Sequence, residues 1–265
     1  MNDLYDFYPC SHSSGSGFSG PECKLLISVP HSGQWIPWND FNSFLIKDST
    51  ALRQDVDYAV DQLLDIPALQ QIGVSVIVAK IHRTAVDLNR KRESAVLAWP
   101  HNSHGITLVQ ERPTAQLEKE LLENYYEPYY QKIDSVYKQL KEPESVPFID
   151  LHSMPSLATD YHLKINPHQK KERPSYCLSD QLGKSCSKDF ILRVQDYFLK
   201  KSIDATINDP YIGGGITQHY ASYQWPNIQI EINRKLYMDE HQFELTSQAQ
   251  KVKEDLHQLF QMLVT

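Results

Sequence analysis

Four short apolar runs alternate with amphipathic stretches along the chain, and this alternation limits the possible folds more than any other feature. The apolar runs cover residues 24–29, 74–81, 148–151 and 228–232. Each run is rich in Val, Ile or Leu, which is typical of a buried strand. The amphipathic stretches have helical periodicity and cover residues 50–64, 111–140, 187–204 and 242–263. Strands that alternate with helices predict an α/β protein with a largely parallel sheet.

Length and composition are those of a globular chain without internal divisions. At 265 residues the chain can form one large domain or two small ones. Its 41% hydrophobic and 22% charged residues exclude the disordered and fibrous classes. No change in composition marks a linker, so we predict one domain over residues 23–265. Residues 1–22 contain a Ser- and Gly-rich stretch and are predicted to form a flexible N-terminal arm.

Charge and cysteine usage limit the expected partners and location. The formal net charge is −7 and Lys and Arg form no extended cluster, so nucleic acid and anionic membranes are not expected partners. The sequence also lacks a transmembrane run and the pattern of a secretory signal. No CxxC pair occurs among the four cysteines, which are Cys10, Cys23, Cys177 and Cys186. Reduced thiols and a cytoplasmic location are therefore predicted.

Polar side chains lie at the ends of all four predicted strands. In strand order they are His31; Arg83, Asp87, Asn89 and Arg90; His152; and Glu231. In an open α/β sheet, the loops at the carboxyl ends of the strands form the binding crevice. Imidazoles, carboxylates and guanidiniums gathered there predict an active site rather than a solvated surface.

A metal site is one interpretation of the two histidines. His31 and His152 each follow a predicted strand, and two imidazoles with one carboxylate suit a catalytic zinc ion. The candidate carboxylates are Asp55, Asp57 and Asp61, of which the last two would share one face of a helix. The residues alone leave open that the aspartates form a solvated helix face and that each histidine is an ordinary loop residue.

Six sequence fragments occur in a specific order, and together they resemble a known family. The fragments are VPHSG, DVDYAVD, HRTAVDLNR, IDLHSMP, GGGITQHY and QIEINRKLYMDE. From about residue 25 to about residue 240, the chain resembles the N-formylglutamate amidohydrolase family, which is similar to zinc carboxypeptidases and aspartoacylases. The resemblance implies a single three-layer α/β/α domain around a mixed, largely parallel sheet. It also implies a zinc-dependent hydrolase that removes a formyl or other acyl group from a small acyl amino acid.

The resemblance implies a metal-ligand set. His31, Asp57 and His152 match the zinc ligands, and Asp57 is preferred over Asp55 because it matches the family's recurrent aspartate. Carboxypeptidases take two ligands from a His-x-x-Glu pair. That pair is absent here because the third residue after His31 is Gln34, so the acidic ligand must come from farther along the chain.

The resemblance also implies catalytic and anchoring roles. Asn89 and Arg90 would hold a substrate carboxylate, Arg83 would polarise the scissile carbonyl, and Glu231 would be the general acid and base. A guanidinium forms a planar fork that fits a carboxylate. Glu231 stands among β-branched residues, where a buried carboxylate indicates function. The alternative for Glu231 is an outward position on a surface strand.

Asp87 and its neighbours allow more than one interpretation. Arg90 could instead form a surface ion pair with Asp87 or Glu93. We expect Asp87 to orient its neighbours or brace the loop rather than to take part in the chemistry. For His101 and His104, a surface loop is expected rather than a second metal site.

A glycine-rich segment resembles the family's substrate loop. Gly214, Gly215 and Thr217 are predicted to bind substrate, because glycine lets backbone amides approach a ligand. The family commonly has Arg after the Thr, whereas this chain has Gln218. Recognition of a second carboxylate, and so of glutamate, is therefore left open, as is any role of His219.

Two other functions fit the same residues. One is a non-catalytic binder of acyl amino acids or peptides, and the other is a carboxypeptidase-like peptidase. Retention of the candidate chemical residues favours the enzyme. The acyl group, the amino acid side chain and the oligomeric state are not specified by the sequence.

Overall fold

The computed structural model describes residues 4–11 and 23–265, which fold around a seven-stranded sheet of order β1-β3-β2-β4-β7-β5-β6. The strands are β1 (Tyr5–Tyr8), β2 (Leu25–Val29), β3 (Val74–Ala79), β4 (Phe148–Met154), β5 (Tyr176–Ser179), β6 (Ala205–Ile207) and β7 (Asn227–Asn233). β3, β2, β4 and β7 are parallel, whereas β1 and β5 run antiparallel to β3 and β7. The predicted mixed, largely parallel sheet is confirmed.

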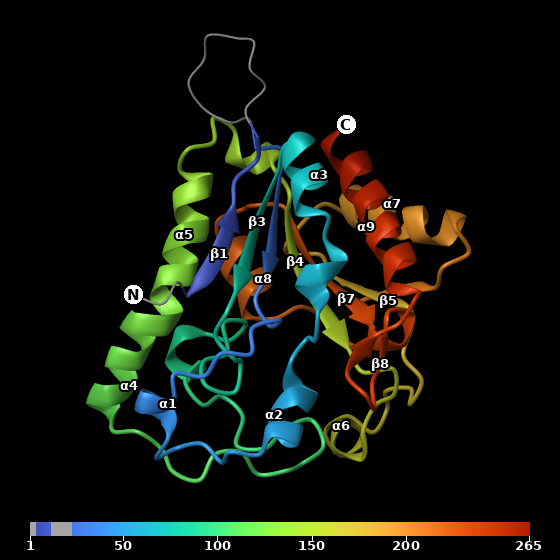
Figure 1. Ribbon diagram of the computed structural model, residues 1–265. Helices are drawn as coiled ribbons and strands as arrows, with labels where there is room; N and C mark the ends of the chain where they lie inside the picture. The colour runs from blue at the N-terminus through green and yellow to red at the C-terminus, as the bar shows by residue number, and fades with distance from the viewer. Residues whose placement is uncertain (1–3, 12–22) are drawn as a thin grey trace.

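Helices cover both faces of this sheet, with α8 behind the strands and α3 in front of them in Figure 1. The helices are α1 (Trp38–Phe41), α2 (Ser49–Asp55), α3 (Ile66–Gln71), α4 (Ala115–Leu121), α5 (Glu127–Tyr137), α6 (Asp160–Ile165), α7 (Lys188–Lys200), α8 (Gly215–Ala221) and α9 (Ala249–Val264). Buried residues of α5 and α8 form one core with the strands, and those of α3, α7 and α9 form another. The three-layer α/β/α architecture is therefore confirmed.

The side chains of β2 alternate between these two cores. Leu25, Ile27 and Val29 pack with α3 and α9, whereas Leu26 packs with α5. Because both faces of a central strand are buried, its sequence is a continuous apolar run rather than a polar–apolar alternation. Burial on both faces makes the central strands a firm support for the residues at their carboxyl ends.

The helix predicted at residues 50–64 is interrupted in the structure. After α2 the chain becomes extended, and Ala59 adopts a left-handed conformation with a φ of 57°. A 3₁₀ turn, Val60–Leu63, follows. A left-handed residue cannot continue a right-handed helix. The prediction that Asp57 and Asp61 share a helix face is therefore wrong, and Asp57 lies in the break.

Three other segments refine the predicted elements. Tyr5–Tyr8 pair with β3, which corrects the predicted arm over residues 1–22 at this segment; residues 12–22 lie outside the described part. The long helix predicted at residues 111–140 consists of α4 and α5 joined by a π-helical turn. α9 begins later than predicted because β9 (Glu244–Leu245) pairs with β8 (Met238–Asp239).

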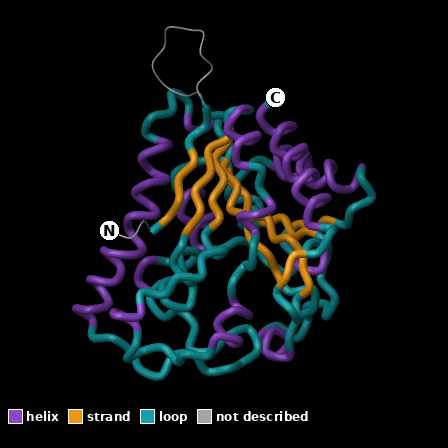
Figure 2. The backbone as a smooth tube through the Cα atoms, in the orientation of Figure 1, coloured by secondary structure: helices purple, strands orange, loops and turns teal. Residues whose placement is uncertain are grey.

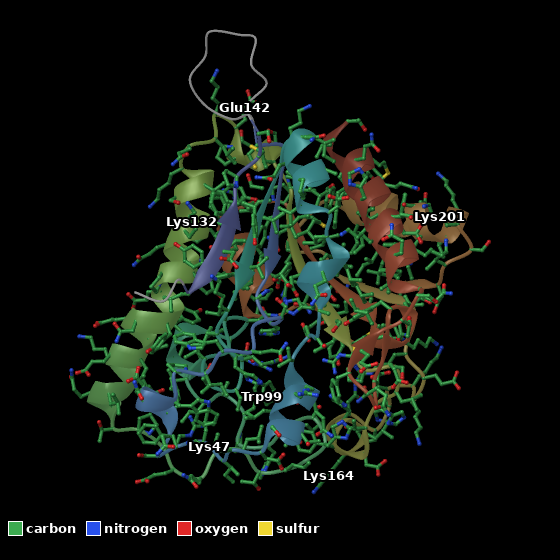
Figure 3. All side chains as sticks on the ribbon, viewed as in Figure 1. Lys47, Trp99, Lys132, Glu142, Lys164 and Lys201 are labelled. Atoms are coloured by element: carbon green, nitrogen blue, oxygen red, sulfur yellow. The ribbon has the colours of Figure 1, made fainter. Side chains whose placement is uncertain are left out.

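The carboxyl ends of the parallel strands point into a half of the molecule that is built mainly of loops (Figures 1 and 2). This half carries Trp99, below the sheet in Figure 3. It contains the segments that follow β2 and β3, which carry the predicted site residues His31, Asp57, Arg83, Asn89 and Arg90, whereas His152 and Glu231 lie inside β4 and β7.

Two further predictions concern cysteines and membranes. All four cysteines are free thiols. Among the helices of the described chain, none combines the length and the apolar character that a membrane span requires.

Candidate active site

His31, Asp57 and His152 meet at the carboxyl edge of the sheet. His31 follows β2, and His152 lies inside β4 rather than after it. His152 Nδ1 lies 3.0 Å from Asp57 Oδ2, and His31 Nδ1 lies 3.7 Å from the same oxygen. One candidate ligand atom from each residue lies within 4.8 Å of the other two. Each of the three residues is only 2% exposed, so bulk water is largely excluded from this candidate metal site, which we call the metal-ligand cluster.

The other imidazole nitrogens are each backed by a buried aspartate. His31 Nε2 lies 2.8 Å from Asp87 Oδ1, and His152 Nε2 lies 3.0 Å from Asp150 Oδ2. A carboxylate behind an imidazole fixes the ring and leaves the opposite nitrogen to bind a cation. His31 Nδ1 is buried and has no hydrogen-bond partner in the described part of the chain. These donors, two Nδ1 atoms around one carboxylate, fit a metal ion of the zinc type.

Local contacts explain why Asp57, rather than Asp55 or Asp61, reaches the cluster. Asp57 N donates to His31 O at 3.0 Å, which ties the break after α2 to the loop after β2. Asp55 instead accepts a hydrogen bond from Ser103 N at 2.8 Å. Asp61 lies in the 3₁₀ turn that follows.

Arg234 holds the same break from the other side, although the sequence did not identify it. Its Nη2 donates to Val56 O at 2.8 Å, and its Nη1 donates to Gln54 O at 3.1 Å. Nη2 also lies 3.4 Å from Asp57 Oδ1, and Nε donates to Ser153 Oγ at 3.2 Å. This buried guanidinium therefore has a partner at each of its nitrogens and fixes the acidic ligand in place.

Electrostatics keeps the aspartates of the site ionised. Burial by itself would raise the pKa of Asp57, but the hydrogen bond with His152 and the charges of His152 and His31 hold that pKa well below its ordinary value. Burial would also raise the pKa of Asp87, and the charges of Arg83 and His31 lower it strongly instead. Both side chains are therefore available as carboxylates, the form that metal binding requires.

Glu231 lies beside the cluster on β7. In the parallel pairing of β4 with β7 it stands opposite His152. It is 8% exposed, so the alternative of an outward-facing strand residue is wrong. Gln229 Nε2 donates to Glu231 Oε1 at 2.7 Å. Burial raises the pKa of Glu231, with the charge of His152 opposing the rise, and a raised pKa suits a group that accepts and returns a proton.

Asp87 organises the loop after β3. Its Oδ1 accepts a hydrogen bond from Asn89 N at 2.9 Å, besides contacting His31. Its Oδ2 accepts hydrogen bonds from Arg83 Nη2 at 3.0 Å and from Trp99 Nε1 at 2.8 Å. The structure thus places Asp87 as the residue that orients both the metal-ligand cluster and Arg83.

The side chain of Asn89 is bonded within the protein. Its Oδ1 accepts a hydrogen bond from Ile216 N at 2.9 Å. Its Nδ2 lies 3.3 Å from Gln229 Oε1 and 3.2 Å from His152 Nε2. The amide therefore connects the cluster to α8, whereas the sequence predicts that it holds a substrate carboxylate.

Arg90 is partly open to solvent. Its side chain is 42% exposed, and its guanidinium carbon lies 4.0 Å from the centre of the Trp99 ring. Nε lies 3.8 Å from Asp87 Oδ2, so one of the two predicted ion pairs is present. Stacking on the indole holds the guanidinium plane while part of it stays accessible to a ligand.

The glycines before α8 pack directly against the segment of Asn89 and Arg90. A Cβ on Gly214 would clash with the Asn89 amide, and one on Gly215 would lie 2.7 Å from Arg90 C. Gly214 N donates to Gln229 Oε1 at 2.7 Å, and Gly215 N donates to Asn89 O at 2.8 Å. Both amides are thus used within the protein, and the glycines are required for close packing.

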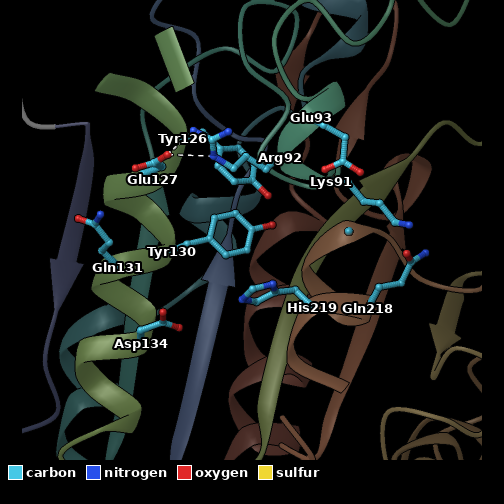
Figure 4. A pocket seen from close by; sticks show the side chains of 11 residues that line it. Lys91, Arg92, Glu93, Tyr126, Glu127, Tyr130, Gln131, Asp134, Gln218 and His219 are labelled. Atoms are coloured by element: carbon cyan, nitrogen blue, oxygen red, sulfur yellow. Dashed lines mark hydrogen bonds and ion pairs between the residues drawn. The ribbon is translucent and has the colours of Figure 1, made fainter. Parts of the chain in front are cut away.

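Helix α8 carries Thr217, Gln218 and His219. Thr217 is fully buried, and its hydroxyl has no hydrogen-bond partner among the described residues. Gln218 and His219 line a cavity next to the site (Figure 4). The His219 ring lies 5.1 Å from the ring of Tyr130 on α5.

This cavity has a volume of about 490 Å³ and lies between α5, α8 and residues 91–93 (Figure 4). Tyr126 and Tyr130 line it, and their hydroxyls donate to Arg90 O at 2.9 Å and to Leu88 O at 2.7 Å. The metal-ligand cluster does not line it. The cavity is therefore a neighbour of the site, beside the backbone that carries Arg90.

Asp150 and Gln229 belong to the site although the sequence did not single them out. Asp150 lies two residues before His152, and Gln229 lies two residues before Glu231. Alternate residues of a strand point to the same face. That spacing was the signal by which both could have been found.

Comparison with known proteins decides the family. The model of the N-formylglutamate amidohydrolase family matches residues 23–238. The chain belongs to this family. The resemblance predicted from the six fragments is confirmed, and the protein is a hydrolase that acts on an amide bond.

Individual relatives agree with this assignment. The chain is 27% identical over 231 residues to an N-formylglutamate deformylase of Pseudomonas putida, a match that covers 82% of each chain. The crystal structure of an N-formylglutamate amidohydrolase from Ralstonia eutropha superimposes with a TM-score of 0.75 at 22% identity, covering 98% of this chain and 97% of that one. A gene product of Agrobacterium tumefaciens gives a TM-score of 0.61 at 16% identity, with coverage of 92% and 91%. The two structures show a shared fold.

Proposed function

We propose that the protein is a zinc-dependent hydrolase that removes the formyl group from an N-formyl amino acid such as N-formylglutamate. The metal-ligand cluster beside Glu231 is the observation that carries this proposal. A metal site next to a buried carboxyl group of raised pKa suits hydrolysis by water. The family and the Pseudomonas putida relative support the substrate class.

His31 Nδ1, His152 Nδ1 and a carboxylate oxygen of Asp57 would hold the zinc ion. When bound, zinc supplies a Lewis acid that acidifies water and polarises a carbonyl oxygen. The chain's own task is to keep these donors fixed, with Asp87 behind one imidazole and Asp150 behind the other. The unpartnered His31 Nδ1 supports this assignment.

Glu231 would take the proton from the attacking water and deliver it to the leaving amine. The hydrogen bond from Gln229 occupies Oε1, so Oε2 is left for the proton. The raised pKa of Glu231 helps the carboxyl group to accept and hold that proton until the amine takes it. General acid–base catalysis of this kind contributes about 10²–10⁴-fold to the rate.

Arg83 would stabilise the negative charge that develops on the carbonyl oxygen. Its Nη2 is held by Asp87, and its side chain is 23% exposed, so the guanidinium is oriented and still accessible. A well-placed donor at this position is worth about 3–4 kcal/mol in hydrolases.

Arg90 would bind the α-carboxylate of the amino acid, with its plane held by Trp99. Asn89, Gly214 and Gly215 would support this anchor from behind, because their polar groups already have partners in the protein. A direct substrate contact of Thr217 and a cytoplasmic location remain predictions from the sequence.

Zinc content and turnover measured on one preparation test the proposal. We expect close to one zinc per chain and release of formate from N-formylglutamate, lost with a chelator and restored by zinc. N-acetylglutamate and a short peptide serve as comparison substrates. Binding of the formyl compound without turnover would favour the non-catalytic binder, and cleavage of the peptide alone would favour the peptidase.

A further inference from the structure

Arg173 is a buried guanidinium without an acidic partner. It is 3% exposed, and its Nη1 donates to the hydroxyl of Tyr211. Its Nη2 makes only a long contact of 3.4 Å with Gln169 Oε1. Nε has no hydrogen-bond partner within residues 4–11 and 23–265, and no carboxylate there forms an ion pair with this side chain.

The second buried arginine of this region provides a comparison. Arg234 is 5% exposed, and it is satisfied by two backbone carbonyls, the Ser153 hydroxyl and the Asp57 carboxylate. An arginine side chain stays charged in a protein, and a buried charge is costly unless it is paired. The hydrogen bonds and the ion pair of Arg234 thus satisfy its buried charge. The buried charge of Arg173 has no anionic partner in the described part of the chain.

Arg173 lies next to the candidate active site. Asn233, two residues after Glu231 on β7, donates its Nδ2 to Arg173 O at 3.1 Å. Cys177 stands opposite Glu231 in the sheet, and its Sγ lies 3.5 Å from Tyr211 O. The pair of Arg173 and Tyr211 therefore lies on the β5 side of Glu231.

The proposed α-carboxylate anchor comes from a separate segment of the chain. Arg90 belongs to the loop after β3, and in the sheet β3 and β5 lie on either side of β2, β4 and β7. The two segments come together near Gly215, which packs against Arg90 and follows Tyr211, the partner of Arg173, by four residues. A substrate with two carboxylates can bind one to Arg90 and the other to Arg173.

We propose that Arg173, oriented by the Tyr211 hydroxyl, binds the second carboxylate of a dicarboxylic N-acyl amino acid. This inference rests on the proposed function. Because Nη1 is occupied by Tyr211, the edge formed by Nε and Nη2 is the one left for a bidentate carboxylate. The substrate carboxylate would replace Gln169 Oε1 at Nη2. Arg173 thus supplies the positive charge that Gln218 does not.

The test compares N-formylglutamate with N-formylglutamine, which differ only in the charged group. For Arg173→Gln we expect kcat/KM on N-formylglutamate to fall about 100-fold, mainly through KM, because a buried charge pair is lost. On N-formylglutamine the change should stay below about threefold. Arg173→Lys keeps the charge but lacks the planar guanidinium. Its kcat/KM should fall about tenfold on N-formylglutamate and stay unchanged on N-formylglutamine. The matched control is Lys171→Gln, which removes an exposed charge from the same segment and should change neither substrate.

A purely structural role of Arg173 would give a different result. It would lower kcat/KM equally for both substrates, and that outcome would overturn the proposal. Melting temperatures of all variants show whether folding is affected. Tyr211→Phe provides a second, milder variant, because it keeps the aromatic ring under the guanidinium and removes only the hydroxyl. It should weaken binding of the acid selectively.

The affinities of N-formylglutamate and N-formylglutamine, measured by calorimetry on the Glu231→Gln variant, separate this inference from the proposed function. If the wild-type protein hydrolyses neither formyl compound, the proposed function fails. The inference still stands in that case if N-formylglutamate binds more tightly than N-formylglutamine and Arg173→Gln removes the difference. Equal affinities with Arg173 present would overturn it whether or not the enzyme is active.

Discussion

The candidate site has an inner and an outer half, and the protein holds them in different ways. In the inner half, His31, Asp57 and His152 are each 2% exposed, and each imidazole is backed by a buried aspartate. In the outer half, the side chains of Arg83 and Arg90 are 23% and 42% exposed on the loop after β3. The inner half is fixed by buried strands, by buried carboxylates and by Arg234, whereas the outer half is fixed by the loop after β3 and by stacking on Trp99.

This difference separates the residues that would hold the metal from those that would contact the substrate. Metal binding requires ligands held to within a fraction of an ångström, which the ends of buried strands provide. Substrate selection tolerates loops, which vary without disturbing the core. Substitutions of His31, Asp57 or His152 should therefore remove the metal and nearly all turnover, whereas substitution of Arg90 should change KM and leave the metal in place.

The largest effect is expected for His152→Ala. Removing this ligand should reduce zinc from about one per chain to near zero and abolish nearly all activity, while the large core keeps the fold. Elemental mass spectrometry and circular dichroism on the same sample check both points. His104→Ala is the matched control, because this exposed histidine lies outside the cluster. Stoichiometric zinc in His152→Ala would remove the distinction between the two halves.

Asp87→Asn tests the contribution of the carboxylate that contacts His31 from outside the metal-ligand cluster. It keeps the shape but weakens the contact with His31 and Arg83, so zinc affinity or activity should fall about 10–100-fold. Competition with a chromophoric chelator measures the affinity. Asp55→Asn, on an aspartate that bonds Ser103 N outside the cluster, should retain wild-type affinity. The opposite ranking of the two variants would make Asp55 the important carboxylate.

Arg90→Lys probes the outer half. The charge is kept but the bidentate fork is lost, so KM for N-formylglutamate should rise about tenfold with zinc content unchanged. A substrate whose α-carboxylate is converted to an amide should be insensitive to the substitution. Equal losses on both substrates would mean that Arg90 does not contact that carboxylate.

His82 is buried like the cluster histidines but has no acidic partner among the described residues, so we expect its protonation to affect the stability of the fold. Its Nε2 lies 3.1 Å from Leu52 O and its Nδ1 accepts from Thr84 N, which satisfies the neutral ring. Burial lowers the pKa of His82 from 6.5 to about 4. Between these values the unfolded chain binds a proton that the folded protein does not, so stability falls as the pH falls from 6.5 to about 4.

The loss from His82 should reach on the order of 3 kcal/mol at the acid end of this range. Urea unfolding at a series of pH values measures it, with His82→Gln as the variant. The pH dependence of the unfolding free energy should be shallower in that variant. An unchanged slope would show that other groups cause the acid sensitivity.

The central strands could be predicted because their sequences alone require burial. β2 and β3 are almost entirely apolar and pack on both faces, whereas β4 and β7 alternate apolar residues with polar residues that include His152 and Glu231. β1, β5 and β6 were not predicted, since short strands depend on pairing with a neighbour more than on composition. The break after α2 was missed because the contact of Asp57 N with His31 O overrides the local helical pattern.

The site residues that lie at strand ends or in the family fragments could be predicted from the sequence. His31, Asp57 and His152 come together as expected, and Glu231 lies beside them. Arg234 could not be found, because its partners Gln54 and Val56 lie about 180 residues earlier and only the tertiary fold brings them together. The internal bonding of the Asn89 amide was hidden for the same reason.

Glu231→Gln tests the central claim most directly, that a buried metal-ligand cluster and a separate proton carrier share the inner half. The substitution keeps the shape but cannot accept a proton. We predict that kcat for N-formylglutamate falls about 10²–10⁴-fold, while zinc content and the Kd for substrate stay near their wild-type values. Loss of zinc together with activity would instead make Glu231 a metal ligand. Unchanged kcat would contradict its role in proton transfer altogether.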